Sequence, residues 1–468
     1  MIDFWNIIQS IQHELLLFSA IWFLIGAADE SLVDIIWAMH KARRWFSHYR
    51  HKPQLRSGEL GAPARSGMIA IFIPAWNEAQ VIGAMLRRCT AAWQGSNTAY
   101  RIYVGCYPND PASIAAIRSG AAGNPNCRLV LCTSDGPTTK ADCLNRLWRA
   151  LVADELGAGF KAKAIVLHDA EDYVHADELR VFDLLVEKAN AVQLPVIPIQ
   201  VPGSAWISGH YCDEFAEAHG KTLVVREAIG AALPLAGVGC AIERNHLGRI
   251  AIANGGAPFD QRSLTEDYEL GLGVAGNGQR TIFARILDAD GQLVGTRACF
   301  PSTLSASVRQ KTRWMIGIAL AGWDRLGWRG GMAEFWMRLR DRKAVFASVV
   351  LTCAYICIVL TGLVTLADLS GLVDARMPSP LVIQLLALNA FMLVWRLLVR
   401  AAFVAQAQGM QAALLSIPRT LIANIISILA ARRAVSGYAG HLLGRALQWD
   451  KTTHSHFPSL GPTTSNAP

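Results

Sequence analysis

The segment IVLHDAEDYVHADEL, residues 165–179, runs from an apolar stretch directly into a group of acids. Asp169, Glu171 and Asp172 follow the apolar residues closely, which is typical of a buried strand that exposes carboxylates at its end. Closely spaced carboxylates are hard oxygen ligands that suit Mg²⁺ or Mn²⁺. Such an ion commonly bridges to a diphosphate and neutralises charge on a leaving group. These residues alone leave a second interpretation open, in which the acids lie in a solvated loop and cap the next helix.

For two nearby patterns, a structural role is favoured over ligand binding. His168 and His175 flank the acids and could ligate a metal, but a polar supporting role or a surface position is favoured. The segment GLGVAGNG contains G-x-G-x-x-G at Gly271, Gly273 and Gly276. It follows a helical pattern and not a strand, so close helix packing and a turn are favoured over a dinucleotide site.

The acids belong to a larger pattern in the middle of the chain. Four apolar runs read as strands that end in polar loops: MIAIFIPAWNE, YRIYVGCYPND, CRLVLCTSDG and AKAIVLHDAED. Helical patterns alternate with them, which predicts a Rossmann-like α/β domain with a mostly parallel sheet and helices on both faces. In such sheets, ligands bind beyond the carboxyl ends of the strands. The candidate residues are therefore the polar ones after each strand: Asn77 and Glu78, Asn109 and Asp110, Ser134 and Asp135, and Asp169 and Glu171.

The two ends of the chain are expected to contact a bilayer. Hydrophobic residues make up 52% of the 468 residues and the net charge is +8, while the mean hydropathy is +0.27. Residues 1–40 are predicted to form an N-terminal transmembrane helix, and residues 41–66 a basic cytoplasmic linker that opens with KARRWFSHYRHK. Positive charge marks the cytoplasmic side of a membrane protein, so the middle of the chain is placed in the cytoplasm. No nucleic-acid partner is expected.

Three acids interrupt the pattern of the first helix. They are Asp29, Glu30 and Asp34, and the last two share a helix face because they are four residues apart. They could contact another helix or simply lie at the membrane interface, and the interface is favoured.

Residues 344–432 are predicted to form the C-terminal transmembrane and interfacial helices. A charge-free run over residues 344–366 is long enough to span, and a second run returns from Leu381. A third, ALLSIPRTLIANIISILA, could also span, but Pro418 and Arg419 are costly in lipid. It is therefore predicted to be a broken helix at the inner interface. Residues 433–468 are expected to be a cytoplasmic tail.

The ten cysteines are scattered and form no C-x-x-C pair. Several, such as Cys106 and Cys132, lie in apolar strand-like runs. They are predicted to be reduced core residues and not disulfides or zinc ligands.

Further motifs connect the acids to a known family. SLTEDYELG places Glu266 and Asp267 before a helix, and VRQKTRWMIG contains Q-x-x-R-W. With PAWNE, YPND, KADCLN and DAED, in this order and between membrane helices, the chain resembles the membrane-embedded family 2 glycosyltransferases typified by cellulose and hyaluronan synthases. GCYPNDP, HDAED, ERNHLG, LSIPR and WDKTTHSHFP further resemble the bacteriophage adsorption protein B-like glycosyltransferases of Gram-negative inner membranes, over residues 3–458. Longer members of that group carry an additional cytoplasmic domain implicated in sensing nucleotide second messengers, and such regulation is not expected from the residues present here.

The resemblance implies a cytoplasmic GT-A-like domain over residues 67–305 and a nucleotide-diphosphate sugar, such as a UDP-sugar, as donor. In this comparison Asn77, Glu78 and Asp110 hold the nucleoside. Lys140, in TTKADCLN, lies near the base and the phosphates.

The resemblance also assigns the Mg²⁺ or Mn²⁺ ligands. Asp169 approaches the ribose and the metal, and Glu171 takes the second position of the family's D-x-D motif, where Asp is commoner. Because Glu is longer by one methylene, Asp172 remains a competing ligand.

The remaining roles fall on the TED and Q-x-x-R-W motifs, the latter within interfacial helices over residues 306–343. By resemblance, Gln310 and Arg313 grip the diphosphate, for which the planar Arg fork is suited. Trp314 forms part of an acceptor platform, and Asp267 is the catalytic base of an inverting transfer. A purely structural interpretation of Glu266 and Asp267 is that acids are favoured at a helix N-terminus.

The segment PLAGVGCAIER, residues 234–244, has small residues in a strand pattern. In the family this region borders the acceptor, so the small residues could leave room for a sugar. A simply packed strand is an equal alternative.

The combined expectation is a multi-pass protein of the bacterial inner membrane that builds a surface or exported polysaccharide or a lipid-linked glycan. Its partners would be the nucleotide sugar, a glycan or lipid-linked acceptor, the bilayer and an envelope export partner. The alternative is a catalytically silent scaffold for glycan export or phage adsorption. A membrane nucleotidyltransferase could share the acids but would not need Q-x-x-R-W.

Overall fold

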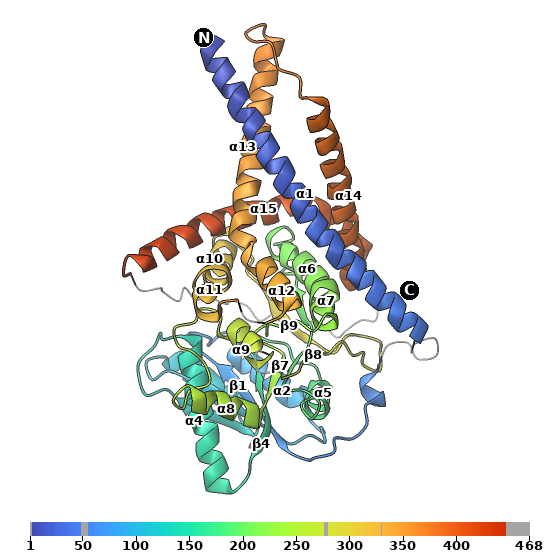
Figure 1. The fold of residues 1–468 in the computed structure, drawn as a ribbon. Helices are drawn as coiled ribbons and strands as arrows, with labels where there is room; N and C mark the ends of the chain where they lie inside the picture. The colour runs from blue at the N-terminus through green and yellow to red at the C-terminus, as the bar shows by residue number, and fades with distance from the viewer. Residues whose placement is uncertain (1, 48–54, 276–278, 329, 446–468) are drawn as a thin grey trace.

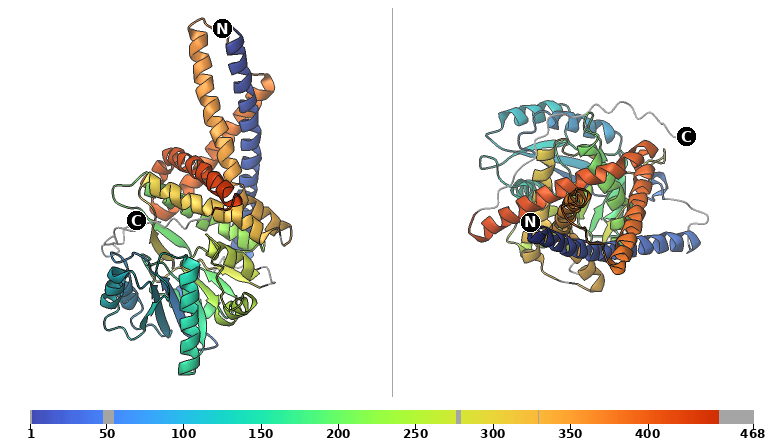
Figure 2. Two further views of the ribbon diagram at one scale, coloured as in Figure 1. Left: turned by 90° about the vertical axis from the view of Figure 1, so that its left-hand side faces the viewer. Right: turned by 90° about the horizontal axis from the view of Figure 1, so that it is seen from above.

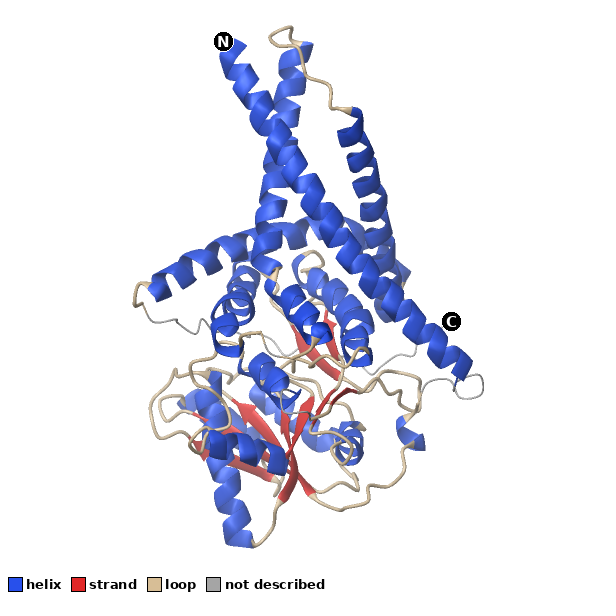
Figure 3. Cartoon of the chain, in the orientation of Figure 1, coloured by secondary structure: helices blue, strands red, loops and turns tan. Residues whose placement is uncertain are grey.

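The computed structural model describes residues 2–47, 55–275, 279–328 and 330–445. An α/β domain forms one end of the molecule, and long helices project from it (Figure 1). Strands are confined to the α/β domain, as Figure 3 shows.

The strands form two sheets. They span Met68–Pro74 (β1), Tyr100–Cys106 (β2), Cys127–Leu131 (β3), Ala162–Leu167 (β4), Ala191–Gln193 (β5), Val196–Ile199 (β6), Cys240–Glu243 (β7), Thr281–Phe283 (β8) and Thr296–Cys299 (β9). The main sheet has the order β3-β2-β1-β4-β7-β5-β8, and β6 pairs with β9 separately. The strands β1 to β4 are mutually parallel, so their carboxyl ends share one edge, whereas β7 is antiparallel to β4 and β5. The predicted α/β fold with a mostly parallel sheet is confirmed.

Helices cover both faces of the main sheet and continue toward the membrane helices. They span Ile82–Ala92 (α2), Pro111–Gly120 (α3), Lys140–Ala158 (α4), Glu178–Leu185 (α5), Ile207–Glu217 (α6), Leu223–Ala228 (α7), Arg244–Ala253 (α8), Glu266–Ala275 (α9), Leu304–Trp314 (α10), Ala321–Leu326 (α11) and Met332–Arg342 (α12). Two π-helical turns, η2 (Ala218–Thr222) and η3 (Met315–Leu320), join α6 to α7 and α10 to α11.

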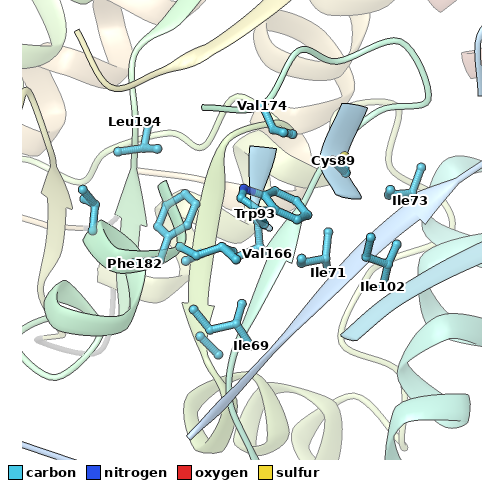
Figure 4. Close-up of a cluster of buried hydrophobic side chains, with 14 of the residues drawn as sticks. Ile69, Ile71, Ile73, Cys89, Trp93, Ile102, Val166, Val174, Phe182 and Leu194 are labelled. Carbon is cyan, nitrogen blue, oxygen red and sulfur yellow. The ribbon is translucent and has the colours of Figure 1, made fainter. Parts of the chain in front are cut away.

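The core consists of two apolar layers, one on each face of the main sheet. Ile69, Ile71 and Ile73 of β1 pack with α2, α3 and α5 in one layer, part of which is shown in Figure 4. The alternate residues Ala70 and Phe72 pack with α4, α8 and α9 in the other. Because successive side chains of a strand point to opposite faces, a strand buried on both faces must be apolar throughout. This explains the uninterrupted run MIAIFIP.

Two smaller expectations are also confirmed. All ten cysteines are free, and most are buried. Gly271 lies in α9 against the segment before β7, where an added Cβ would come within 2.4 Å of the Leu235 nitrogen. This glycine therefore serves close packing, as expected; Gly276 lies outside the described residues.

Among the described residues, four helices are long and apolar enough to cross a membrane: α1 (Ile2–Ser47), α13 (Ala344–Leu369), α14 (Pro380–Gln408) and α15 (Met410–Leu442). The helices α1, α13 and α14 rise away from the α/β domain. In contrast, α15 runs across their base and packs on α6 and α10 of the α/β domain (Figures 1 and 2). Length and composition alone do not distinguish these two orientations, and the interfacial assignment of α15 stays a prediction.

Two helices extend further than expected, and one expected break is absent. The first helix does not end at residue 40 but continues through the basic stretch to Ser47. The last helix is not broken at Pro418, and it extends beyond residue 432 to Leu442. A proline removes only one backbone hydrogen bond, and packing along the rest of a long helix can maintain it. The later part of the expected tail, including WDKTTH, lies outside the described residues.

The acids of α1 contact other helices, contrary to the favoured expectation. Asp29 pairs with Arg340 and Lys343 and accepts a hydrogen bond from Trp336 Nε1 at 2.7 Å. Glu30 Oε1 lies 2.8 Å from Arg340 Nη2. These pairs join α1 to the end of α12, directly before α13.

The third acid belongs to a buried network. The Lys221 ammonium in η2 lies 2.5 Å from Asp34 Oδ1 and 2.7 Å from Glu217 Oε1, and its side chain is 1% exposed. Glu217 also pairs with Arg396 at 2.7 Å and Arg400 at 3.2 Å, both on α14. One cluster of charges thus links α1, α6, η2 and α14.

Replacing Lys221 tests the buried charge network that links α1, α6, η2 and α14. Lys221→Met should lower the free energy of unfolding by about 3 kcal/mol, because removing one member of a buried pair leaves uncompensated charge. Denaturant titration of the purified protein in micelles measures the effect. Lys41→Met is the control because Lys41 is exposed on α1. Equal stability of the two variants would contradict the role of the network.

Candidate active site

The acid-rich loop begins where β4 ends. β4 is parallel to β1 and hydrogen-bonded to it, so Asp169 and Glu171 emerge beside the PAWNE loop. Both side chains line a cavity of about 170 Å³, as does Glu78 of that loop. The carboxyl edge of the sheet therefore gathers the acids, as the strand pattern predicts.

A buried histidine supports this loop. His168 is 0% exposed, with Nδ1 3.0 Å from Asp172 Oδ2 and Nε2 2.9 Å from Glu178 Oε1. Burial by itself lowers the pKa of His168, but the Glu178 and Asp172 carboxylates outweigh it and raise the pKa to about 10. Asp172 Oδ2 also accepts the Asp169 backbone N–H at 3.0 Å. The histidine thus has the supporting role that the sequence favoured. Asp172, expected as a competing metal ligand, directs Oδ2 into the loop and also lines the cavity.

One amine that lines the cavity lies close to several acids. Thr139 caps α4, so Lys140 is the first helical residue, and its Nζ lies 2.7 Å from Asp169 Oδ1. Burial lowers the pKa of Lys140, but the carboxylates of Asp169, Glu266 and Asp267 outweigh burial and hold this pKa above its usual value. Lys140 therefore stays charged and partly offsets these acids.

Glu266 and Asp267 are the first two residues of α9. Burial and the neighbouring Asp267 raise the pKa of Glu266 to about 7. Burial likewise raises the pKa of Asp267, against the opposing effect of Lys140. Gly237 has a φ of +73°, and a Cβ at this position would lie 2.5 Å from Asp267 Oδ2. The small residue therefore makes room for this carboxylate, whereas β7, later in the same segment, is a packed strand.

The end of α10 contributes the Q-x-x-R-W side chains. Gln310, Arg313 and Trp314 line the same cavity, and their spacing places them on one helix face. Gln310 Oε1 is buried and has no hydrogen-bond partner among the described residues.

Asn77 and Asp110, predicted to hold the nucleoside, do not line the cavity, and neither do the candidates Asn109, Ser134 and Asp135. Asp110 accepts the Asn77 backbone N–H through Oδ2 at 2.6 Å and that of Ser113 through Oδ1 at 3.1 Å, which caps α3. Asn77 has a φ of +54°, a conformation that asparagine tolerates better than most residues. These residues shape the loop beside the cavity.

The prediction missed four aromatic residues that line the cavity: Trp76, Tyr107, Phe215 and Phe300. Trp76 and Tyr107 follow β1 and β2, and their rings meet edge to face at 5.3 Å. Their place after strands is the same signal that identified the polar residues. Phe215 comes from α6 and Phe300 follows β9, so no local pattern indicates that they meet.

A second cavity, about 730 Å³, lies between α8, α9 and α11 and also reaches Glu266. None of the residues predicted to hold donor, metal or acceptor lines it. The smaller cavity is therefore the candidate active site, although the other is larger.

Comparisons with known proteins agree with this geometry. A family model described as "Glycosyltransferase like family 2" matches residues 65–317, more than half of the chain. Bacteriophage adsorption protein B of Escherichia coli (strain K12) is 35% identical over 472 residues, which cover 96% of this chain and 63% of that protein. Bacteriophage N4 adsorption protein B of Escherichia coli O157:H7 gives the same values. The chain thus spans less than two thirds of the length of these relatives.

A solved structure shares the fold. The mannosyltransferase PcManGT from Pyrobaculum calidifontis, in complex with GDP-Man and Mn²⁺, has a TM-score of 0.50 and 17% identity, covering 88% of this chain and 99% of that chain. The α/β domain is accordingly GT-A-like.

The buried carboxyl group of Glu266 predicts how the stability of the protein depends on pH. The usual pKa of Glu266 is 4.5 and the folded value is about 7. Between these values the unfolded chain releases this proton while the folded chain keeps it, so the free energy of unfolding falls as pH rises through this window. Glu266→Gln should therefore be more stable than the parent protein at pH 8, on the order of 2 kcal/mol, and equal to it at pH 4.

Denaturant midpoints at the two pH values measure this difference. Asp290→Asn serves as control, since Asp290 is exposed. A stabilisation that is the same at both pH values would show that Glu266 does not titrate in this window.

Proposed function

This chain belongs to the family 2 glycosyltransferases, and on that premise we propose that it is an inverting hexosyltransferase. It would transfer a sugar from a nucleotide diphosphate, such as UDP, to a glycan or lipid-linked acceptor. The observation that carries this proposal is that Lys140, the acids after β4, Asp267 and the Q-x-x-R-W side chains line one cavity. These groups come from separate parts of the sequence, and each matches a need of the transfer.

The nucleotide would lie along the carboxyl edge of the sheet. The loop shaped by Asn77 and Asp110, together with Glu78, would hold the nucleoside, with the rings of Trp76 and Tyr107 beside it. The nucleobase of the donor must be determined by experiment, since the solved neighbour contains GDP-Man and not a UDP-sugar.

The diphosphate would lie where the cations are. Lys140 stays charged in the cavity, and Arg313 and Gln310 line it from α10. An Arg fork and an ammonium both stabilise phosphate oxygens, and they do so more strongly away from water.

The cavity fits a divalent ion. The described residues hold no group of three or more His, Cys, Asp or Glu side chains that could bind one, but Mg²⁺ is commonly bound by one or two carboxylates together with substrate phosphates. Asp169 and Glu171 would supply these carboxylates. When bound, Mg²⁺ or Mn²⁺ would neutralise charge on the diphosphate. Lys140 and Arg313 offset only part of the acid charge that lines the cavity, and the solved neighbour contains Mn²⁺.

Asp267 would act as the base. It would accept the proton of the acceptor hydroxyl as that oxygen attacks the anomeric carbon from the side opposite the diphosphate. The carbon–oxygen bond to the diphosphate breaks, and its charge is received by Arg313 and Lys140. Burial raises the pKa of Asp267, which makes this carboxylate a stronger base.

The transmembrane helices suggest where this happens. The basic stretches at the end of α1 and in α12 favour a cytoplasmic domain under the bacterial inner membrane. α15 would lie at the inner interface. The product would be a surface or exported polysaccharide or a lipid-linked glycan, with an envelope protein as export partner.

The alternative is a catalytically silent scaffold for glycan export or phage adsorption. The name of the related adsorption protein B favours it. The complete acid set and the Q-x-x-R-W side chains in one cavity favour the enzyme.

The first test concerns the metal and the donor. Purified protein with Mn²⁺ or Mg²⁺ and a panel of nucleotide sugars should release nucleoside diphosphate with at least one donor. Asp169→Ala should abolish metal-dependent donor binding, measured by calorimetry, because it removes a carboxylate that would share the ion with the diphosphate. Full donor binding by this variant in chelator would refute the metal assignment.

The second test concerns the base. Asp267→Asn is nearly isosteric and should keep donor binding while transfer falls by about 10²–10⁴-fold, because the proton acceptor is lost. Asp290→Asn, at an exposed position, is the matched control. The deciding measurement is glycan production by cells with normal amounts of the variant in the membrane. Undiminished product would exclude Asp267 as base and favour the scaffold.

A further inference from the structure

The cavity of about 730 Å³ between α8, α9 and α11 has no role in the proposed transfer, and we infer that it binds an anionic sugar. The ligand would carry its charge on a phosphate or a carboxylate group, held by His246 and Arg249 of α8. This second site would be separate from that of the donor, since Glu266 is the one described residue that lines both cavities. Binding there does not require the proposed transfer to occur.

The motif ERNHLG forms the start of α8, and most of it has a structural role. Glu243 caps the helix and accepts the His246 backbone N–H at 2.7 Å. Arg244 pairs with Glu155 at 2.5 Å, and an added Cβ at Gly248 would come within 2.8 Å of the Arg244 guanidinium. These contacts fix the helix in place. The His246 side chain differs from them, because it is 3% exposed and lines the second cavity.

The hydrogen bond between His246 and Arg249 places the proton of the imidazole ring. Arg249 Nη2 lies 3.3 Å from His246 Nδ1. A guanidinium can only donate, so Nδ1 accepts and the neutral ring carries its proton on Nε2. Burial and the neighbouring Arg249 lower the pKa of His246, which favours this neutral form. The Nε2–H group is therefore a donor.

This donor lacks an acceptor. Nε2 of His246 is buried and has no hydrogen-bond partner within the part of the chain that the structure describes. An unpaired buried donor is costly, and its cost is removed when an acceptor is supplied. An oxygen of a ligand in the adjoining cavity could accept this hydrogen bond after a small rotation of the ring.

The charged side chains that line the second cavity leave an excess of positive charge. Arg262 pairs with Asp260 at 3.0 Å, and Arg325 pairs with Glu269. Arg249 remains, because it forms none of the ion pairs found among the described residues. A guanidinium fork suits the oxygens of a phosphate or a carboxylate. The side chain left without a counter-ion thus lies beside the donor left without an acceptor.

The second cavity is opposite in charge to the candidate active site. Carboxylates outnumber the amine around Lys140. Glu266, which lines both cavities, has a pKa of about 7, raised by burial and by Asp267. It is therefore only partly charged at neutral pH and repels an anion less than a fully ionised acid would. The second cavity thus suits an anion, and the candidate active site suits a cation.

The rest of the lining favours a sugar as the carrier of this anion. Asn254 offers a side-chain amide and Asp260 a carboxylate to hydroxyl groups, while Ile250, Leu270 and Leu326 add an apolar wall. None of the described lining residues is aromatic, so a nucleobase would find no ring on which to stack. The volume falls within the range of about 300–1,000 Å³ that is usual for small-molecule sites. A sugar phosphate and a uronic acid both meet these conditions.

Calorimetry with matched ligands tests the second site. The full chain in phosphatidylcholine nanodiscs, with saturating UDP or GDP and Mg²⁺ to occupy the candidate active site, is titrated with glucose 1-phosphate, glucuronate, sulfate and glucose. The parent protein should bind glucose 1-phosphate or glucuronate and should not bind neutral glucose. Binding of the first alone would identify a phosphorylated sugar, and binding of the second alone a uronic acid. Sulfate bound as tightly as either would overturn the assignment of a sugar.

Variants of α8 assign the binding to this cavity. Arg249→Gln should weaken binding of the sugar anion by roughly tenfold, because a charge-assisted hydrogen bond is lost. Arg118→Gln is the matched control, since Arg118 is exposed on α3, outside the cavity. His246→Phe keeps a ring without the Nε2–H group and should also weaken binding; it is the second variant should Arg249→Gln fail to fold. Unchanged nucleoside diphosphate binding reports that a variant is folded.

The outcomes separate this site from the proposed function. Equal binding of the sugar anion by the parent protein, Arg249→Gln and His246→Phe would overturn the second site alone. So would the absence of sugar-anion binding in a parent protein that binds a nucleoside diphosphate. A parent protein that binds the sugar anion through Arg249, but binds no nucleoside diphosphate, would support the second site and overturn the transferase.

Discussion

Compensation of buried charge between the α/β domain and the membrane helices is the constraint on which the rest of the structure depends. Glu217 at the end of α6 is shared by Lys221, Arg396 and Arg400, and Lys221 is shared in turn with Asp34 of α1. A charge left unpaired at such a site is strongly destabilising, so few relative positions of these helices are acceptable. The network therefore fixes α6 beneath α14, and α6 carries one wall of the cavity.

The same constraint operates at the candidate active site, with the opposite excess of charge. Around Glu217 the cations outnumber the acid, whereas around Lys140 the carboxylates of Asp169, Glu266 and Asp267 outnumber the amine. The elevated pKa values of Glu266 and Asp267 follow from burial and from this imbalance. A cation arriving with the substrate would relieve the excess, which supports the proposed use of a charged, metal-bound donor.

The sequence predicted what local patterns determine. The apolar runs and polar ends of β1 to β4 predicted the sheet, the shared carboxyl edge and four of the charged residues that line the cavity: Glu78, Asp169, Glu171 and Asp172. Features created by distant contacts could not be predicted in this way. Glu178 reaches His168 only once the loop folds, and Phe215 and Phe300 meet because α6 lies beside β9's end. The partners of Asp29 lie more than 300 residues away in α12 and after it.

Helix α15 shows why composition alone could not assign the membrane helices. Its apolar content would suit a span, and its proline does not break it. The decisive residue is Arg419, which is 1% exposed because its guanidinium enters the α/β domain, 2.7 Å from Asp213 and 3.1 Å from the Gly209 carbonyl of α6. An added Cβ at Gly209 would come within 3.0 Å of that guanidinium, so a small residue is needed there. A charge satisfied by the domain below cannot lie at the centre of a bilayer, which favours the interfacial position that the mid-helix arginine first suggested.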